Sequence, residues 1–389
     1  MIPKKLCVMT GTRAEYGLLK YLMRAIDSSS DFQLQLVVAA AHLLPQLGST
    51  QNEILADGFI PDAQVDMLLA SNTPLSVAKS TALGMLGFAD AFDRLKPDML
   101  IVLGDRFEAL AAAQAAYLQR IPVAHLHGGE LTLGALDDAI RHAITKLSAI
   151  HFVAYEAYAR RVRQLGEENW RIQCVGDMVT DALIHTHWLS RDVLAQALEL
   201  DAQKQWILLT YHPETLGNND DLIAVNTIYQ ALCQQVPNAH YIWTYPNADA
   251  GGDRLLSWLL ATAKKDARIK AVGSLGQRYL SVMKESIAVV GNSSSGLLEA
   301  PWLGVPTINV GTRQAGRLRS VSVFDCTLDV DVITDALSRA QSFTIVINDS
   351  VRVSPSEQVM AYLRHLNWQA LLPKGFIDRE CSSTTRHLS

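Results

Sequence analysis

The chain has 389 residues, of which 49% are hydrophobic and 19% charged, and its 34 basic and 39 acidic residues give a formal net charge of −5. This length exceeds what one hydrophobic core usually supports, so two domains are expected, and the acidic balance argues against nucleic acid or an anionic membrane as a partner. Five scattered cysteines without a CxxC pair predict neither a disulfide framework nor a zinc motif, which favours a reducing, cytoplasmic location.

The N-terminal half begins with "MIPKKLCVMTG", whose short apolar run predicts a strand rather than a signal peptide. Further short apolar runs alternate with longer helical patterns, which is typical of strands buried on both faces of a parallel sheet. The sequence has no apolar run of about 18 residues, so no membrane span is expected. The expected strands are 6–10, 34–39, 98–105, 123–128, 150–154 and 172–177, and the expected helices include 74–94, 107–119 and 136–147.

A polar, poorly periodic linker around 185–204 precedes a second alternating set. Its expected strands are 206–212, 240–246, 269–273, 287–292 and 306–311. Two such sets predict an α/β fold of two doubly wound, Rossmann-like domains, with ligands at the carboxyl ends of the strands. The expected domains are 1–180, joined by a C-terminal helix at 356–375, and 181–355, followed by a disordered tail at 379–389.

A loop of small residues in "VVGNSSSGLLEAP" (289–301) follows an expected strand and precedes a helix. Small residues let a phosphate approach the backbone, the hydroxyls of Ser293 and Ser294 add donors, and Glu299 is placed to bind ribose hydroxyls. The alternative is that serine and glycine only cap the helix. The loop is neither a Walker loop nor a GxGxxG fingerprint.

Basic residues follow two other expected strands. Arg13 in "TGTRAEYGLL" (10–19) is placed to reach an anion, because an arginine fork suits phosphate. Arg313 lies in "NVGTRQAGRLR" (309–319), which carries three arginines and no acid. The alternative in both cases is a solvated surface arginine.

Titratable residues follow two more strands. Asp105 and Arg106 in "LGDRFEAL" (103–110) are candidates for a site, although Asp105 alone fits a helix cap as well. His212 in "LTYHPETLG" (209–217) is a candidate catalytic group or a hydrogen-bonded structural histidine.

The segment "HLHGGELTLGALDDAIRH" (125–142) concentrates three carboxylates and three histidines around a Gly-Gly pair. Its spacing lacks an HExxH pattern, so a metal site is the lesser alternative. His127, Glu130 and Asp137 would flank one cleft as acid–base groups, with the Gly-Gly pair letting the backbone approach the substrate. The remaining alternative is that Asp137 and Asp138 cap a helix while Arg141 pairs with one of them.

Taken together, these motifs resemble the hydrolysing UDP-N-acetylglucosamine 2-epimerase family of bacterial sialic and legionaminic acid biosynthesis. The resemblance runs in one order through roughly residues 5–320. It rests on GTRAEYG, LGDRFEA, HLHGGELTLGALDDAIRHAITKLS, YHPETL, PNADAG and GNSSSGLLEAPWLGVPTINVGTRQAGR. It implies a glycosyltransferase-B-like fold with UDP in the cleft between the domains.

The resemblance also implies roles for single residues. Asp105, Asp137 and the position of His127 would be acid–base groups, with Glu130 or Asp105 sharing the task, because many relatives have glutamate where this chain has His127. Asn247 would lie near the uracil. The nucleotide would be held by Arg13, His212, Ser293, Ser294, Glu299 and Arg313, and we also expect Arg106 in the binding site and His212 among the catalytic groups.

The implied reaction converts UDP-N-acetylglucosamine and water to N-acetylmannosamine and UDP through a glycal, without a metal or another cofactor. One alternative is the same chemistry on UDP- or GDP-2,4-diacetamido-2,4,6-trideoxyglucose. The second is a glycosyltransferase on the same fold. The expected partner is a small-molecule sugar nucleotide, and the family implies a homodimer or homotetramer.

Overall fold

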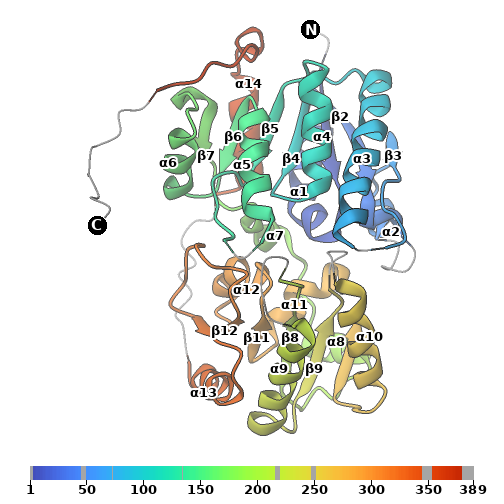
Figure 1. The fold of residues 1–389 in the computed structure, drawn as a ribbon, viewed down its shortest axis with the longest axis vertical. Helices are drawn as coiled ribbons and strands as arrows, with labels where there is room; N and C mark the ends of the chain where they lie inside the picture. Colours follow the sequence, from blue (N-terminus) through green and yellow to red (C-terminus); the bar gives the residue numbers. More distant parts are fainter. Residues whose placement is uncertain are drawn as a thin grey trace.

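The computed structural model describes residues 3–44, 50–71, 73–133, 135–214, 220–246, 251–343 and 353–378. Two β-sheets lie one above the other, each with helices on both faces (Figure 1). The seven-stranded sheet has the order β3-β2-β1-β4-β5-β6-β7 and the six-stranded sheet the order β10-β9-β8-β11-β12-β13. Every strand pairing described is parallel, which confirms the predicted class of two doubly wound α/β units.

The strands of the first sheet are short and buried, as expected for a sheet covered on both faces. Leu6 in β1 pairs with Leu34 on one side and Met99 on the other, which fixes the register at the centre. The strands are β1 (Lys4–Thr10), β2 (Phe32–Ala39), β3 (Ala63–Val65), β4 (Met99–Leu103), β5 (Val123–Leu126), β6 (Ile150–Val153) and β7 (Ile172–Cys174).

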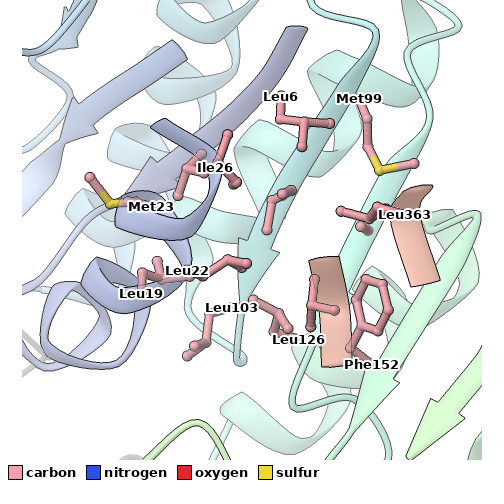
Figure 2. Close-up of a cluster of buried hydrophobic side chains, with 14 of the residues drawn as sticks. Leu6, Leu19, Leu22, Met23, Ile26, Met99, Leu103, Leu126, Phe152 and Leu363 are labelled. Atoms are coloured by element: carbon pink, nitrogen blue, oxygen red, sulfur yellow. The ribbon is translucent and has the colours of Figure 1, made fainter. Parts of the chain in front are cut away.

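Side chains of β1 alternate between two cores. Leu6 and Val8 face the core shared with α1 and α14 (Figure 2), whereas Cys7 and Met9 face the core shared with α3 and α4. The helices around this sheet are α1 (Arg13–Asp27), α2 (Gln51–Ala56), α3 (Pro74–Leu95), α4 (Phe107–Leu118), α5 (Asp137–Leu147), α6 (Glu156–Gln164), α7 (Val179–His185) and α14 (Pro355–Arg364).

The second sheet is built in the same way. Its strands are β8 (Trp206–Thr210), β9 (His240–Thr244), β10 (Ile269–Val272), β11 (Ala288–Gly291), β12 (Thr307–Val310) and β13 (Val323–Cys326). Its helices are α8 (Arg191–Leu198), α9 (Asp221–Gln235), α10 (Gly252–Ala263), α11 (Tyr279–Lys284), α12 (Ser295–Leu298) and α13 (Val330–Gln341). Among the residues described, no helix is long and apolar enough to span a membrane.

The chain connects the two units through apolar contacts. Val179 and Leu183 of α7 belong to the same buried cluster as Trp206 of the second sheet, so α7 packs at the junction. The chain then returns, and Val359 and Leu363 of α14 pack in the core of the first sheet (Figure 2). The contact of α7 with the second unit is therefore apolar, whereas polar residues of the two units meet at the cleft.

Three local expectations are wrong. The linker around 185–204 contains α8, which buries Leu194, Ala195 and Leu198 and is capped by Ser190, because three apolar residues are enough to pack one face against the second sheet. The edge strands β3 and β13 were not expected, since neither is a long apolar run. The closing helix, expected at 356–375, ends at Arg364.

Candidate active site

A cavity of about 640 Å³ lies where the carboxyl ends of the two sheets face each other. Its walls come from the segment after β1, from α1 and α7, and from the segments after β8, β9, β10 and β11. Ligands of doubly wound folds bind at this edge, and the volume suits a nucleotide-sized molecule. Five of the residues expected to bind the nucleotide line it: Arg13, His212, Ser293, Ser294 and Glu299.

The wall on the second unit is fixed by the loop after β11. Gly291 has a φ of +133°, and a Cβ there would lie 2.0 Å from the carbonyl oxygen of Thr210, so only glycine fits. Asn292 then joins this loop to the one after β8: its Oδ1 accepts from the amide of His212 at 2.7 Å, and its Nδ2 donates to the His212 carbonyl at 2.8 Å. His212 is thereby held at the cavity wall.

Ser293 and Ser294 lie on the cavity wall at the start of α12, but this helix has only four residues. A helix macrodipole needs several turns, so α12 contributes less to anion binding than the sequence suggested. The serine hydroxyls and loop amides remain as donors.

Glu299 follows α12 and presents a carboxylate to the cavity. Its Oε2 is buried without a hydrogen-bond partner in the part of the chain described. Burial, reinforced by the negative charge of Asp177, raises the pKa of Glu299 to about 7. An unsatisfied acceptor of this kind suits the hydroxyl donors of a ribose, and ribose binding by Glu299 stays a prediction.

Arg13 begins α1, whose capping box is formed by Thr12 and Glu15. Its guanidinium crosses the cleft: it donates to the carbonyl of Gly276 at 2.5 Å and lies 5.0 Å from the ring centre of Tyr279. Arg13 therefore joins the two units at the cavity and places a positive charge in its wall.

A second charged group, the acid–base cluster, lies beside the cavity and contains Asp105, Glu130, Asp137 and His127. Asp105 forms an ion pair with Arg141, and Arg317 of the second unit lies 3.9 Å from the same carboxylate oxygen. The alternative that Arg141 pairs with Asp137 or Asp138 is wrong, because Arg141 pairs with Asp105, which follows β4.

His127 and Glu130 are buried and bonded to each other. The Nδ1 of His127 lies 2.8 Å from Glu130 Oε1, and Arg317 Nη1 lies 3.3 Å from Glu130 Oε2. Burial alone would raise the pKa of Glu130, but the charges of Arg317 and His127 lower it below its usual value. Glu130 is therefore an ionised carboxylate whose partner is the imidazole.

Asp137 connects this cluster to the cavity loop. Its Oδ2 lies 3.4 Å from Arg313 Nη2, and Arg313 Nη1 donates to the carbonyl of Asn292 at 3.3 Å. The amide of Leu133 also donates to the carbonyl of Ala315 at 3.1 Å. The 312–317 loop of the second unit thus lies directly on the acid–base cluster of the first.

The Gly-Gly pair has a different role from the expected one. A Cβ on Gly129, which has a φ of +79°, would lie 2.5 Å from the carbonyl oxygen of Tyr158 in α6, so the pair lets the turn pack against α6 rather than against a substrate. His125 is structural, since its Nε2 lies 2.7 Å from the carbonyl oxygen of Gly104 and burial lowers its pKa to about 3. No group of three or more potential metal ligands occurs among the residues described.

One other expected residue, Arg106, does not join the cavity wall. Arg106 is buried, with its Nε and Nη2 each 3.3 Å from Glu108 Oε1, so it offsets a buried carboxylate. Asn247 lies outside the described residues. Their nucleotide-binding roles stay predictions.

Sequence reasoning overlooked Asp177, Arg141 and Arg317 as members of the cluster. Asp177 follows β7, and polar residues directly after strands were the signal that found the others. Arg317 lies in the three-arginine loop, where only Arg313 was selected. Arg141 is recognisable only once α5 is placed near Asp105, which follows β4.

Comparisons with known proteins show related sequences and a shared fold. A sequence profile described as UDP-N-acetylglucosamine 2-epimerase matches residues 24–358. The chain is 38% identical over 387 residues to "GDP/UDP-N,N'-diacetylbacillosamine 2-epimerase (hydrolyzing)" of Campylobacter jejuni, covering 97% of this chain and 100% of the relative. It is 36% identical over 338 residues to "UDP-N,N'-diacetylbacillosamine 2-epimerase (hydrolyzing)" of Legionella pneumophila, covering 87% and 89%.

The fold has close counterparts among solved structures. The structure of UDP-GlcNAc 2-epimerase from Neisseria meningitidis bound to UDP-GlcNAc superimposes with a TM-score of 0.76, covering 93% of this chain and 100% of that one. At 17% identity, this similarity concerns the two-domain fold alone.

Proposed function

The chain belongs to the UDP-N-acetylglucosamine 2-epimerase family, and from this premise we propose that it is a hydrolysing 2-epimerase of UDP- or GDP-linked N,N′-diacetylbacillosamine, which is 2,4-diacetamido-2,4,6-trideoxyglucose. The observation that carries the choice of sugar is the 38% identity, over essentially the whole chain, to a relative named for it. The products would be the nucleoside diphosphate and the free sugar inverted at C2.

In the proposed reaction, departure of the nucleoside diphosphate from C1 makes removal of the C2 proton possible. The C2 proton of a 2-acetamido sugar is too weakly acidic for direct abstraction, and departure of the diphosphate from C1 acidifies it. The C2–H electron pair becomes the C1=C2 bond of a glycal, the C1–O pair leaves with the nucleoside diphosphate, and the proton passes to an enzyme base. Water then adds OH at C1 and a proton adds at C2 from the opposite face.

The cavity offers groups for the leaving diphosphate. Arg13, Ser293 and Ser294 line it, and Arg313 lies beside the same loop. Preformed donors of this kind stabilise charge that develops on a leaving group. His212 and Glu299 would hold the nucleotide from the same wall.

The acid–base cluster supplies the proton-transfer groups. Asp105 and Asp137 are the proposed proton donor and acceptor, and Arg313 contacts both Asp137 and the loop of the phosphate-facing serines. Proton transfer by positioned groups typically contributes about 10²–10⁴-fold. His127 and Glu130 would complete the set.

A second candidate substrate is UDP-N-acetylglucosamine, with N-acetylmannosamine and UDP as products. It was the first expectation from the motifs, and the description of the matching family profile supports it. The two substrates share the reaction and differ at C4 and C6 of the sugar.

An NMR assay tests the proposal. The purified chain is incubated in D₂O, without any acceptor, with UDP-N-acetylglucosamine and with the UDP and GDP forms of the diacetamido sugar. We expect a free 2-epimerised sugar carrying one deuterium at C2, formed fastest from a diacetamido substrate. Faster turnover of UDP-N-acetylglucosamine would replace the substrate by the second candidate. A requirement for an acceptor would replace the reaction by glycosyl transfer.

A further inference from the structure

His127 is held at both ring nitrogens by its surroundings. It follows β5 with a φ of +62°, a left-handed conformation that is uncommon for non-glycine residues. Nδ1 lies 2.8 Å from Glu130 Oε1, and Nε2 accepts a hydrogen bond from the Met178 amide at 3.3 Å. The side chain is buried, so these contacts set its protonation state.

Asp177 is the other polar group at Nε2. It follows β7, is only 2% exposed, and its Oδ1 lies 3.6 Å from His127 Nε2 while accepting from the Val179 amide at 3.1 Å. Its Oδ2 is buried without a hydrogen-bond partner among the residues described. A buried carboxylate with an unsatisfied oxygen costs free energy, so its retention needs a reason.

The two protonation states of His127 need different partners at Nε2. The neutral ring donates Nδ1–H to Glu130 and uses its Nε2 lone pair to accept from Met178. The protonated ring carries Nε2–H, which the Met178 amide cannot accept because it is a donor. The Asp177 carboxylate is then the acceptor within reach, needing a movement of less than about 1 Å to reach charge-assisted hydrogen-bond distance.

We propose that Asp177 is a positioning residue that accepts the Nε2 proton of His127 in a hydrogen bond and so lets this buried imidazole carry a proton during the reaction. The catalytic part of this inference rests on the proposed function. Asp177 accepts the hydrogen bond without taking up the proton, although burial raises the pKa of this carboxyl above its usual value.

Charged groups from four segments face His127. Glu130 lies on its own turn, Asp177 follows β7, Glu299 follows α12 in the second unit, and Arg317 comes from the 312–317 loop. Burial lowers the pKa of His127, but the charges of Glu130 and Asp177 outweigh burial and the opposing effect of Arg317, so that the pKa lies above its usual value.

The experiment is an NMR titration of the His127 ring in the full chain, with the signal assigned by its loss in His127→Gln. In Asp177→Asn we expect the pKa of His127 to fall by about 1 unit or more, as for loss of an opposite charge in a buried pair. Asp177→Ser keeps a hydroxyl acceptor for the Val179 amide. If the asparagine variant does not fold, the pKa of His127 is measured in this serine variant, and the same fall is expected. An unchanged pKa in a folded variant would overturn the inference.

Asp181→Asn is the matched control. Asp181 lies on the same segment and is fully buried, but its oxygens accept from Ser354 and Ser356 of the α14 start. Its loss should lower the unfolding midpoint and leave the titration of His127 unchanged. An equal fall in both variants would show a general effect of losing a buried carboxylate and would overturn the role of Asp177.

Turnover gives the second reading. In Asp177→Asn, kcat near neutral pH should fall about 10–100-fold, while the KM for the nucleotide sugar should stay within about two-fold. In a chain that already carries His127→Gln, the same substitution should lower kcat little further. Full additivity of the two losses would overturn the coupling. Should the wild-type chain turn over none of the sugar nucleotides, the proposed function fails, whereas the titration still decides whether Asp177 controls His127.

Discussion

Replacing Glu299 by glutamine should make the ligand-free protein more stable and a weaker nucleotide binder. Glu299 has a buried Oε2 without a partner, and its pKa is raised from a usual 4.5 to about 7. A carboxyl whose pKa is raised on folding destabilises the folded state once the pH exceeds the pKa that the carboxyl has in the unfolded chain. Wild-type stability is therefore complete below about pH 4.5, falls as the pH rises to about 7, and stays reduced above it.

The size of the effect follows from the same pKa. At about 1.4 kcal/mol for each pH unit, the difference between 4.5 and about 7 corresponds to at most about 3.5 kcal/mol at pH 8. Because the Glu299 side chain is only partly buried in the cavity wall, water screens it, and we expect about 1–2 kcal/mol. Glutamine has the same shape without the charge, so the variant should gain this amount.

Urea unfolding followed by tryptophan fluorescence at pH 5 and pH 8 measures the gain. It should be larger at pH 8 than at pH 5, and calorimetry should show weaker binding of the nucleoside diphosphate to the variant. The control Glu357→Gln changes an exposed carboxylate on α14 and should alter stability by less than about 0.5 kcal/mol at both pH values. No gain at pH 8, or an equal gain at both pH values, would refute the reasoning.

Four further substitutions test other parts of the protein. Asp105→Asn and Asp137→Asn should each lower turnover about 10²–10⁴-fold and leave UDP affinity within about three-fold; normal turnover in either variant would remove that residue from the mechanism. His212→Asn should weaken nucleotide binding about ten-fold or more by calorimetry, and unchanged affinity and turnover would exclude the assigned role. Gly129→Ala should lower the free energy of unfolding by about 2–4 kcal/mol, because it adds a clash with a backbone carbonyl of α6 to the cost of a positive φ. Gly58→Ala, at a φ of +92° in open space, should show only the conformational cost of about 1 kcal/mol, so equal losses would contradict the clash.

Most of the architecture was predictable because buried parallel strands leave a local signal. The apolar runs around Leu6, Leu100 and Leu208 are strands in the structure, and the polar residues that follow them meet at one edge. The errors fall where the local signal is weak. The short strands β3 and β13 and the amphipathic α8 owe their conformation to packing against the sheets.

The residues of the candidate site were also predictable only in part. Arg13, His212, Ser293, Ser294 and Glu299 were selected from their places after strands, and the fold brings them to one cavity wall. The partners of the acid–base groups were not predictable. The ion pairs of Asp105 with Arg141, and of Glu130 with Arg317, join residues far apart in the chain, and no local pattern records such distances.

By itself, the sequence determined the class of fold, the order of its strands along the chain and the family, because hydrophobic periodicity and ordered motifs are properties of local segments. Only the tertiary structure decided that the cluster at 125–142 separates into a structural His125, a Gly-Gly turn packed on α6 and a charged group shared with the second unit. It also brought Asp177 to the imidazole of His127. Both outcomes depend on which side chains of distant segments share a buried volume, and burial is what gives charges at 3–4 Å their influence on one another.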